Sequence, residues 1–530
     1  MKHLALDFGS SNTVVATWND ATGQPETLNV AGLSLPPLDG APPLIPSMAF
    51  VDDATTGRCR VGAEVQHAGL DMAGDPRLFR GFKRGLAADV QGFTPRLDGV
   101  EVGAEALGRW FLARVLDALP GKAVEELVVT VPVTAFERYL DWLGQVAARL
   151  PVRRLRVLDE STAAALGYDV SPDEAPVLVI DFGGGTLDVS LVRLPSPSGT
   201  GAVLEGAAAP RAAPGVATVL GKAGLVLGGE DLDEWLLEDF LARHGATPGD
   251  VREDLSMLRA LAERTKIRLS SEPTAELAFF HASTGRTWRH AYTREELEEV
   301  LERHDLFTRI MGALDQVLRQ AEARGLSRAD IGRVLLVGGT TVIPSIHRTL
   351  RQGFPRERVV SHKPFEAVAH GALALSRGTR VEDHLYHGYG IRYWDERRQC
   401  HLYEPIFSPG QAYPTATPVD LVLRASRSGQ AAIELIVGEM EPQGPGAAEV
   451  VFHEGRLVAS PLAQDAPRVV PLNDAPETRT LARLEPPGLP GIDRIKASFL
   501  VDAERRLRLT VVDLQTGTTL VEHAVVTHLR

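Results

Sequence analysis

The predicted fold depends on two stretches, Leu4-Ala5-Leu6-Asp7-Phe8-Gly9-Ser10-Ser11-Asn12-Thr13 and Val179-Ile180-Asp181-Phe182-Gly183-Gly184-Gly185-Thr186-Leu187-Asp188. Aligned on their first aspartates, both read as an apolar strand, Asp-Phe-Gly, two small residues, and Asn or Thr. A second apolar strand follows each turn. The sequence therefore predicts two related strand–turn–strand units, although a pair of ordinary hairpins is the alternative for either stretch taken alone.

Both turns are suited to binding phosphate. Gly, Ser and Thr leave backbone N–H groups accessible to an anion, and the hydroxyls of Ser10, Ser11 and Thr186 add hydrogen-bond donors. The carboxylates of Asp7 and Asp181 would repel phosphate, so their presence favours a Mg²⁺ ion between them and the phosphates, held partly through water. Two such turns facing each other would hold a triphosphate from both sides.

Length and composition exclude several classes of protein. A chain of 530 residues is long enough for two to four domains, and 44% hydrophobic with 24% charged residues is typical of globular proteins. The formal net charge of −13 and the lack of a long Lys/Arg run argue against a nucleic-acid binder. Cys59 and Cys400 lie far apart without metal-ligand spacing, which argues against a zinc site or a disulfide framework.

The N-terminus runs from Met1 directly into the first predicted strand, with no signal peptide before it. No apolar run approaches the ~18 residues that a membrane helix needs. We therefore expect a cytoplasmic protein that does not bind membranes.

Several other segments are candidates for the site. Lys83 lies in a short basic segment, where a solvated lysine is the ordinary interpretation. Glu160 follows a short strand and precedes a helix that we expect Ser161 or Thr162 to cap, so it either complements the helix dipole or lies near a metal or attacking water. Gly228-Gly229-Glu230 opens another helix, and it is either a plain helix start or a close backbone approach to a ligand.

Periodicity predicts three further features of the first part of the chain. A helix after Pro132 should bury Phe136, Leu140, Leu143 and Ala147 on one face. A capping box at Thr293–Glu296 should start one long helix that buries apolar residues through Ala321. The apolar run 334–337, followed by Gly338-Gly339-Thr340, indicates a buried parallel strand whose end approaches a ligand.

The pattern changes after about Gly378. Two-residue alternation replaces helical spacing, as in Ile495, Ala497, Phe499 and Val501. We predict three segments: a nucleotide-binding domain over 1–378, a linker over 379–388, and an all-β domain over 389–530.

Together these segments resemble the heat-shock protein 70 family, the DnaK-like chaperones. The similar signatures, in order along the chain, are 7–13, 129–132, 159–165, 181–188, 227–233 and 337–344. The resemblance implies an α/β actin-like, two-lobed ATPase domain followed by a β-sandwich. It also implies a slow ATP hydrolase that uses ATP or ADP with Mg²⁺ to control binding of unfolded or extended polypeptides, in protein folding and the stress response.

The resemblance also implies roles for individual residues. Asp7 and Asp181 would lie by the magnesium, and Lys83 and Glu160 would orient the attacking water, with Thr186 nearby. The catalytic set is thus Lys83, Glu160, Asp181 and Thr186. The residues implied to bind the nucleotide are Gly9, Ser10, Ser11, Asn12, Gly183, Gly184, Gly185, Thr186, Gly228, Gly229, Glu230, Glu263, Lys266, Ser270, Gly338, Gly339 and Thr340. Ile267 occupies a position where some members carry an arginine over the adenine.

Three departures from the family concern the second domain. The linker segment 380–387 is charged, where the family has a leucine-rich one. The first β-hairpin carries Asp395–Gln399, which cannot form the apolar arch that covers a bound peptide in the family. We also expect no C-terminal helical lid, so a bound client should leave quickly. The family's J-domain co-chaperones and nucleotide-exchange factors are the further partners implied.

Two other classes share the actin-like fold. A filament or scaffold ATPase would lack the C-terminal β-domain. A small-molecule kinase would lack both that domain and the Ser-Thr-Ala-Ala-Ala run after Glu160. Sedimentation with ATP and phosphate transfer to metabolites would distinguish these alternatives from a chaperone.

Overall fold

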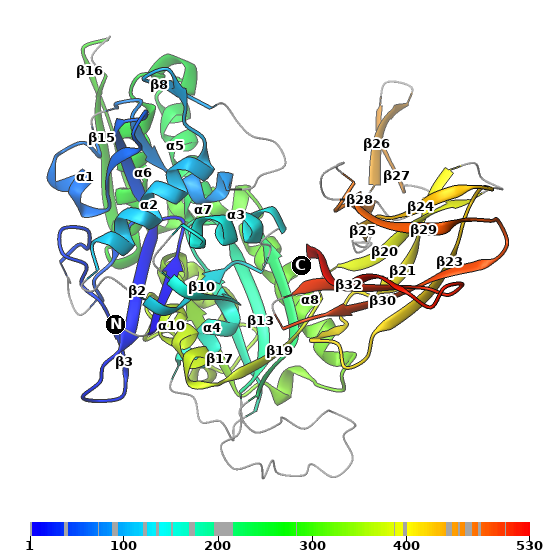
Figure 1. Cartoon of the computed structure of the whole chain (residues 1–530). Helices are drawn as coiled ribbons and strands as arrows, with labels where there is room; N and C mark the ends of the chain where they lie inside the picture. Colours follow the sequence, from blue (N-terminus) through cyan, green and yellow to red (C-terminus); the bar gives the residue numbers. More distant parts are fainter. Residues whose placement is uncertain are drawn as a thin grey trace. The chain divides into compact units, whose positions relative to one another are not determined.

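A computed structural model describes most of the chain, and the fold divides into two compact units, Met1–Val381 (unit 1) and Glu382–Arg530 (unit 2) (Figure 1). The described residues are 3–36, 41–72, 74–86, 94–119, 124–133, 137–149, 152–168, 175–194, 216–281, 284–385, 387–395, 400–440, 448–453, 456–461, 469–474, 479–503 and 505–529. In this part of the chain, no helix is both long enough and apolar enough to cross a membrane.

Unit 1 contains two sheets with the same strand order. The first sheet runs β11-β10-β1-β2-β3, with β4 also paired to β2, and the second runs β18-β17-β12-β13-β14. The strands of the first are β1 (His3–Phe8), β2 (Asn12–Trp18), β3 (Pro25–Thr27), β4 (Ile45–Pro46), β10 (Val124–Val131) and β11 (Val152–Asp159). Those of the second are β12 (Val177–Phe182), β13 (Leu187–Arg193), β14 (Val216–Leu225), β17 (Arg333–Val337) and β18 (Val359–Val360).

This shared order explains why the two quoted stretches are alike. Each forms the central antiparallel hairpin of its sheet, β1–β2 in one and β12–β13 in the other. The first strand of each hairpin also pairs in parallel with a further strand of its sheet: β1 pairs with β10, and β12 pairs with β17. The predicted duplication of strand–turn–strand units is therefore confirmed.

Helices α4 (Glu160–Gly167) and α10 (Ala367–Ala372) join the two lobes. They pack so closely that a Cβ atom on Gly167 would lie 1.9 Å from the Ala367 carbonyl oxygen, and one on Gly371 would lie 1.8 Å from that of Ala163. One hydrophobic cluster combines these helices with both sheets. The shared core fixes the ends of β1 and β12 relative to each other.

Each lobe has its own outer layer and hydrophobic core. The first lobe adds β5 (Met48–Asp53), β6 (Arg58–Val61), α1 (Ala63–His67), β7 (Leu78–Arg80), η1 (Phe82–Gly85), β8 (Arg96–Leu97), β9 (Val100–Glu101), α2 (Ala104–Asp117) and α3 (Glu137–Ala147). The second lobe adds α5 (Gly229–Arg243), η2 (Pro248–Val251), α6 (Leu255–Ser271), β15 (Thr274–His281), β16 (Arg286–Thr293), α7 (Arg294–Arg303), α8 (Leu306–Glu322), η3 (Arg328–Asp330), η4 (Gly339–Val342), α9 (Pro344–Arg351) and η5 (Arg356–Arg358). After α10, η6 (Leu373–Arg377) returns to the first lobe and packs against β1, β2 and β10.

Three local predictions need correction: the cap of α4, the length of the helix after the capping box, and the buried face of α3. The cap of α4 is Asp159, whose carboxylate accepts from the Thr162 backbone N–H, and not Ser161 or Thr162. The expected long helix after the capping box is two helices, α7 and α8, because Asp305 between them has φ = 55°. The Thr293 capping box itself is confirmed.

The buried face of α3 also differs from the prediction. Tyr139, Trp142, Leu143 and Val146 are buried, whereas Leu140 and Ala147 are half-buried. Phe136 lies outside the described residues. The helix is thus rotated by about one residue relative to the predicted face, because two large aromatic side chains are buried at i and i+3.

The described residues of unit 2 form strands only, around one core. Its sheets run β21-β20-β25-β28, β23-β30-β31-β32, β24-β29 and β26-β27. The strands are β20 (Gly388–Asp395), β21 (Cys400–Phe407), β22 (Ala412–Tyr413), β23 (Val419–Arg424), β24 (Gln430–Leu435), β25 (Val437–Met440), β26 (Ala448–His453), β27 (Arg456–Pro461), β28 (Val469–Pro471), β29 (Thr480–Gly488), β30 (Asp493–Val501), β31 (Arg506–Asp513) and β32 (Thr519–His528).

The predicted alternation is confirmed in β30 and β31, where Ile495 to Val501 and Leu507 to Val511 bury every second residue. At the start of unit 2, β19 (Arg380–His384) pairs with β22 through Asp383 and Tyr413. Asp383 is buried, and its carboxylate accepts a hydrogen bond of 2.9 Å from Arg505. The charged segment is therefore tied into unit 2 by a buried ion pair. Residues 396–399 of the first hairpin lie outside the described residues.

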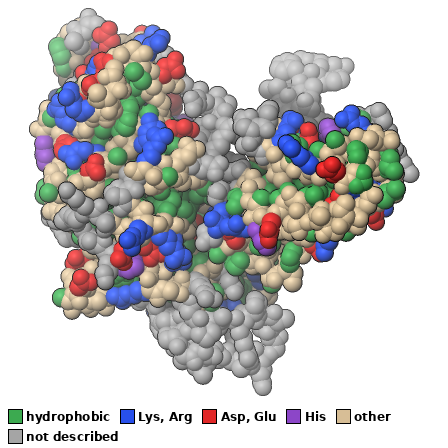
Figure 2. Space-filling model, viewed as in Figure 1, with side chains coloured by type: hydrophobic (Ala, Val, Ile, Leu, Met, Phe, Trp, Pro, Cys, Tyr) green, Lys and Arg blue, Asp and Glu red, His purple; other side chains and the backbone are tan. Residues whose placement is uncertain are grey.

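Charged side chains of both signs are interspersed on the face of unit 1 seen in Figure 2. Several arginines of unit 1 pair directly with carboxylates, as Arg60 does with Asp52 and Arg114 with Glu64. The basic residues in these pairs are therefore neutralised locally.

Candidate nucleotide-binding site

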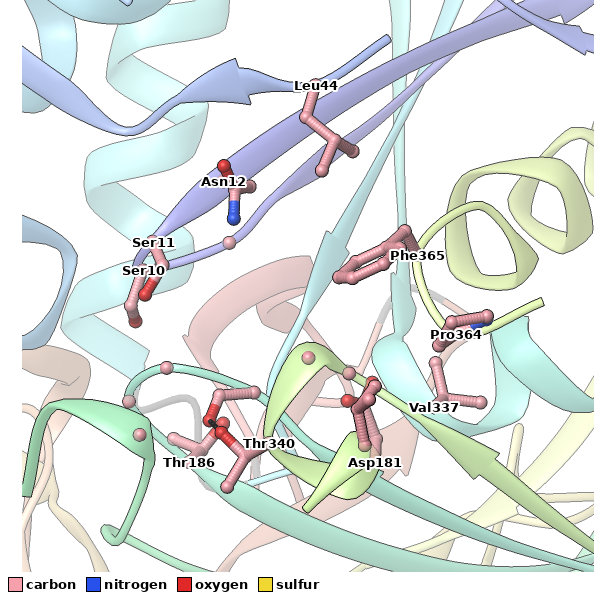
Figure 3. Close-up of a pocket in the computed structure, with 18 of the residues that line it drawn as sticks. Ser10, Ser11, Asn12, Leu44, Asp181, Thr186, Val337, Thr340, Pro364 and Phe365 are labelled. Carbon is pink, nitrogen blue, oxygen red and sulfur yellow. Dashed lines mark hydrogen bonds between the residues drawn. The ribbon is translucent and has the colours of Figure 1, made fainter. Parts of the chain in front are cut away.

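The turns at 9–11 and 183–186 of unit 1 face each other at very short range. A Cβ atom on Gly184 would lie 2.1 Å from the Ser11 hydroxyl oxygen, and one on Gly185 would lie 2.3 Å from that of Ser10. Glycine at these two positions allows this close approach, because a Cβ atom would force the serine hydroxyls of the opposite turn to move. The backbone N–H groups and hydroxyls of both turns thus converge on one space, with Ser10 and Ser11 above Thr186 in Figure 3.

The two other glycine turns meet the second of these turns. The backbone N–H groups of Gly229 and Glu230 donate to the carbonyls of Gly183 and Gly184, at 3.0 and 2.9 Å. The Thr340 hydroxyl donates to the Gly183 carbonyl at 2.8 Å (Figure 3). The turns at 183–186, 228–230 and 338–340 therefore form one continuous wall.

Gly338 is required at its place in this wall. Its φ of 83° lies in the left-handed region, and a Cβ atom there would lie 2.4 Å from the Phe182 carbonyl oxygen. A glycine allows β17 to end against β12 without a clash.

A cluster of charged side chains lies at the base of this space. The Lys83 ammonium nitrogen is 2.7 Å from Glu160 Oε1, and both side chains are buried. Lys83 is in η1 and Glu160 begins α4, so two distant segments form this pair. Asp7 is the penultimate residue of β1, and its carboxylate accepts from the Thr130 hydroxyl at 2.8 Å.

The cluster holds more negative than positive charge, and its pKa values reflect this. Burial, followed by the negative charge of Glu160, raises the pKa of Asp7 to about 7. Burial and the charges of Glu160, Asp7 and Asp188 raise the pKa of Asp181 well above its usual value. Burial alone would lower the pKa of Lys83, but the Glu160 carboxylate raises it, so the ammonium stays charged.

These residues fit a magnesium ion that keeps water ligands. Asp7 and Asp181 are buried carboxylates with too little positive charge around them, so a divalent cation would supply the missing counter-charge. Among the described residues, no three His, Cys, Asp or Glu side chains are grouped closely enough to hold a metal themselves. Magnesium suits such a site, because it binds through one or two carboxylates, substrate phosphates and retained waters.

The turns and the charged cluster line a cavity of about 480 Å³. Of the residues that the sequence assigned to catalysis, nucleotide or metal, all line it except Gly228 and Glu230. Gly228 lies behind the wall, where a Cβ atom would be 2.2 Å from the Gly184 carbonyl oxygen. The Glu230 carboxylate lies outside the cavity and 3.8 Å from Arg84.

Residues of α6 and several apolar side chains complete the lining of the cavity. Lys266 spans from α6 to the Gly229 carbonyl at 2.7 Å and to Asp233 at 2.8 Å. Glu263, Lys266 and Ser270 share one face of α6 and all line the cavity, as their spacing predicts. Burial, opposed by Lys266, raises the pKa of Asp233 to about 6.

Sequence reasoning missed much of the apolar wall. The lining residues that it did not assign are Val14, Leu44, Ser271, Val337, Val342, Ile343, Pro364, Phe365 and Val368. Phe365 and Leu44 project into the space opposite Thr340 (Figure 3). Neither belongs to a motif with polar chemistry, so the sequence offered no signal for them.

Two lobes with duplicated sheets, a cavity between glycine turns and buried carboxylates beside it define an actin-like nucleotide-binding ATPase. The Hsp70 protein family model matches residues 89–381. The chain is similar to the chaperone protein DnaK of Thermotoga neapolitana, with 29% identity over 97% of this chain and 78% of that protein. It is also similar to a ribosome-associated molecular chaperone of Eremothecium gossypii, with 32% identity over 56% of this chain and 46% of that protein.

This chain belongs to the Hsp70 family. The predictions of an actin-like ATPase with a β-sandwich and of an ATP-dependent chaperone of this type are confirmed. So are the expected hydrolysis of ATP and the use of ATP or ADP with magnesium. The matches favour a chaperone over the filament and kinase alternatives.

Proposed function

We propose that the cavity of unit 1 is the ATP-hydrolysis site of this chaperone and that its output controls client binding by the β-domain. In this proposal residues 1–378 form the ATPase domain, 379–388 the connection and 389–530 the client-binding domain. The observation that carries the proposal is the close approach of Ser10 and Ser11 to Gly185 and Gly184, which leaves donors from both lobes around one space. Phosphate groups are the ligands that such converging N–H and O–H donors suit best.

The charged cluster would perform the hydrolysis. Magnesium, when bound with ATP, neutralises phosphate charge, and Asp7 and Asp181 would hold it through its waters. The Lys83–Glu160 pair would orient the attacking water. Each side chain fixes the other at 2.7 Å, and a buried pair needs little reorganisation during the reaction. Thr186 would add its hydroxyl on the γ-phosphate side.

The remaining assigned residues would hold the rest of the nucleotide. Gly9 to Asn12 and Gly183 to Gly185 would bind the phosphates. The turns at 228–230 and 338–340 would support the nucleoside side, with Glu263, Lys266 and Ser270 of α6 around the adenosine. Because Gly228 and Glu230 do not line the cavity, their role would be to support Gly184 from behind.

The partners proposed are unfolded or extended polypeptides, with a J-domain co-chaperone and a nucleotide-exchange factor. DnaK relatives whose similarity covers 97% of this chain support the client. The absence of a helical lid and the cytoplasmic location stay predictions.

Two measurements test the proposal. Equilibrium titration with ATP, with and without Mg²⁺, should give saturable binding that depends on the metal, and a lack of saturable binding would contradict the site. The ATPase rate should rise when an unfolded peptide is added to the full chain. An unchanged rate at saturating peptide would contradict the coupling between the two domains.

A further inference from the structure

Two buried serines connect α4 with β13 through a hydrogen bond that the proposed hydrolysis does not use. The hydroxyl oxygens of Ser161 and Ser190 lie 2.6 Å apart, and both residues are 0% exposed. Helix α4 continues directly from β11 of the first sheet, whereas β13 lies inside the second sheet. Burying a hydroxyl is unfavourable unless it is hydrogen-bonded, and this contact satisfies the hydroxyl of Ser190.

The direction of this bond follows from the other contact of the Ser161 hydroxyl. That hydroxyl donates its one hydrogen to the Asp159 carboxylate at 3.1 Å. Ser161 therefore accepts, and Ser190 donates, in the bond between the two serines. The same Asp159 oxygen accepts from the Thr162 backbone N–H at 2.8 Å, which is the contact that caps α4. A chain of three hydrogen bonds thus runs from β13 to the first turn of α4.

Glu160 lies within this chain of hydrogen bonds. It stands between Asp159 and Ser161 in the sequence, and its side chain lines the cavity. Strand β13 begins directly after Thr186, which lines the same cavity from the second lobe. A fixed distance between α4 and β13 therefore fixes Glu160 relative to Thr186.

A second polar contact joins β13 to the first lobe. The fully buried Asp188 carboxylate accepts from the backbone N–H of Val133, just after β10, at 3.0 Å. Because side chains alternate along a strand, Asp188 and Ser190 lie on the same face of β13. Val192, the next residue on that face, belongs to the hydrophobic cluster that both lobes share. This face thus combines apolar packing, which is not directional, with two hydrogen bonds that are.

We propose that Ser190 is a positioning residue for ATP hydrolysis, which holds Glu160 in its place relative to the second lobe through Ser161. The Lys83–Glu160 pair and Thr186 come from different lobes, so a displacement between α4 and β13 separates groups that must act together. A misplacement of about 1 Å can lower a rate about 100-fold. This inference rests on the role proposed above for Glu160.

The test compares Ser190→Ala with Ser34→Ala in the full chain. Ser34 is also buried, but its hydroxyl accepts from the Val30 backbone N–H at 3.0 Å, and the residue does not line the cavity. Ser190→Ala should lower the single-turnover hydrolysis rate about 5–100-fold, between the loss of one neutral hydrogen bond and a displacement of 1 Å. Its Kd for ATP should stay the same. Both variants should melt at a lower temperature, but Ser34→Ala should keep the wild-type rate.

A double variant tests whether the two serines act together. The hydrolysis rate of Ser161→Ala/Ser190→Ala should match that of the slower single variant, because residues that act as one unit are not additive. A rate lowered by the product of the two single losses would overturn the inference, since the serines would then act independently.

The outcomes separate this inference from the proposed function. If Glu160→Gln hydrolyses ATP at the wild-type rate, the proposed role of Glu160 fails. If Glu160→Gln is inactive but Ser190→Ala keeps the wild-type rate, only the inference about Ser190 is overturned. An equal fall in rate for Ser34→Ala would also overturn it, because the slower hydrolysis would then follow from lost stability.

Discussion

The ammonium nitrogen of Lys83 lies 2.7 Å from Glu160 Oε1, although the two residues are 77 positions apart in the sequence. The short helix η1 supplies one partner and the start of α4 the other. Because α4 also packs against α10 in the core between the lobes, a movement of one lobe relative to the other would change the position of this pair. The proposed catalytic pair and the interlobe core thus share one helix.

Replacing Lys83 with alanine should abolish turnover while ATP still binds, because the phosphate-binding turns are untouched. Removing one partner of a buried ion pair typically costs about 3–5 kcal/mol, so urea unfolding should be measured together with the single-turnover rate. Lys222→Ala is the matched control, since Lys222 is buried but does not line the cavity. Wild-type turnover in Lys83→Ala would refute the catalytic role.

Asp181→Asn should raise the Mg²⁺ concentration needed for half-maximal ATPase activity by about tenfold, the lower range for groups that orient a metal's ligands. The substitution keeps the shape of the side chain and removes a charge in a site whose carboxylates repel one another. A magnesium titration of the ATPase rate checks this prediction. Asp330→Asn, at an exposed helix cap away from the cavity, should leave the titration unchanged. Equal midpoints for the wild type and Asp181→Asn would count against the assignment.

Besides the pairs that Arg84 forms with Glu230 and Asp231, two further ion pairs connect the lobes. Arg80 lies 3.5 Å from Glu263, and Arg264 lies 3.4 Å from Asp71. Partly exposed pairs contribute about 0.2–1 kcal/mol each, so the double variant Arg80→Ala/Arg264→Ala should release a fluorescent ADP analogue about 2–30-fold faster. The difference should shrink at high salt. Arg268→Ala, which breaks a pair within α6, should release it at the wild-type rate. If the double variant does too, the pairs do not hold the lobes together.

The glycine turns of the candidate site could be predicted because close approach of the backbone restricts the residue type. The close approach of residues 184–185 to the Ser10 and Ser11 hydroxyls favours glycine there, and the run of glycines is visible in a single sequence. The faces of α6 were predictable for a similar reason, since Glu263, Lys266 and Ser270 obey helical spacing.

The rest of the site could not be predicted, because tertiary packing determines it. Pro364 and Phe365 reach the cavity from a loop between β18 and α10, and no local pattern marks a loop as a cavity wall. Outside the cavity, the burial of Tyr139 was missed because Leu140 and Ala147 fit the apolar stripe of α3 equally well by spacing. The break between α7 and α8 depends on Asp305 adopting φ = 55°. Aspartate tolerates this conformation, but an aspartate in the sequence does not predict it.

Ile267 gives a test of the nucleoside end. It lines the cavity with Val342, and the two side chains are 57% and 42% exposed, so both present apolar surface to a bound base. Ile267→Arg would place a guanidinium over the base, and an exposed cation–π contact is worth about 0.5–1 kcal/mol. We therefore expect ATP to bind about 2–5-fold tighter by calorimetry, with no change in the affinity for inorganic triphosphate. Ile492→Arg adds the same charge at an exposed site of unit 2 and should change neither affinity. Equal gains for ATP and for triphosphate would mean that the arginine acts through charge on the phosphates, and that the base lies elsewhere.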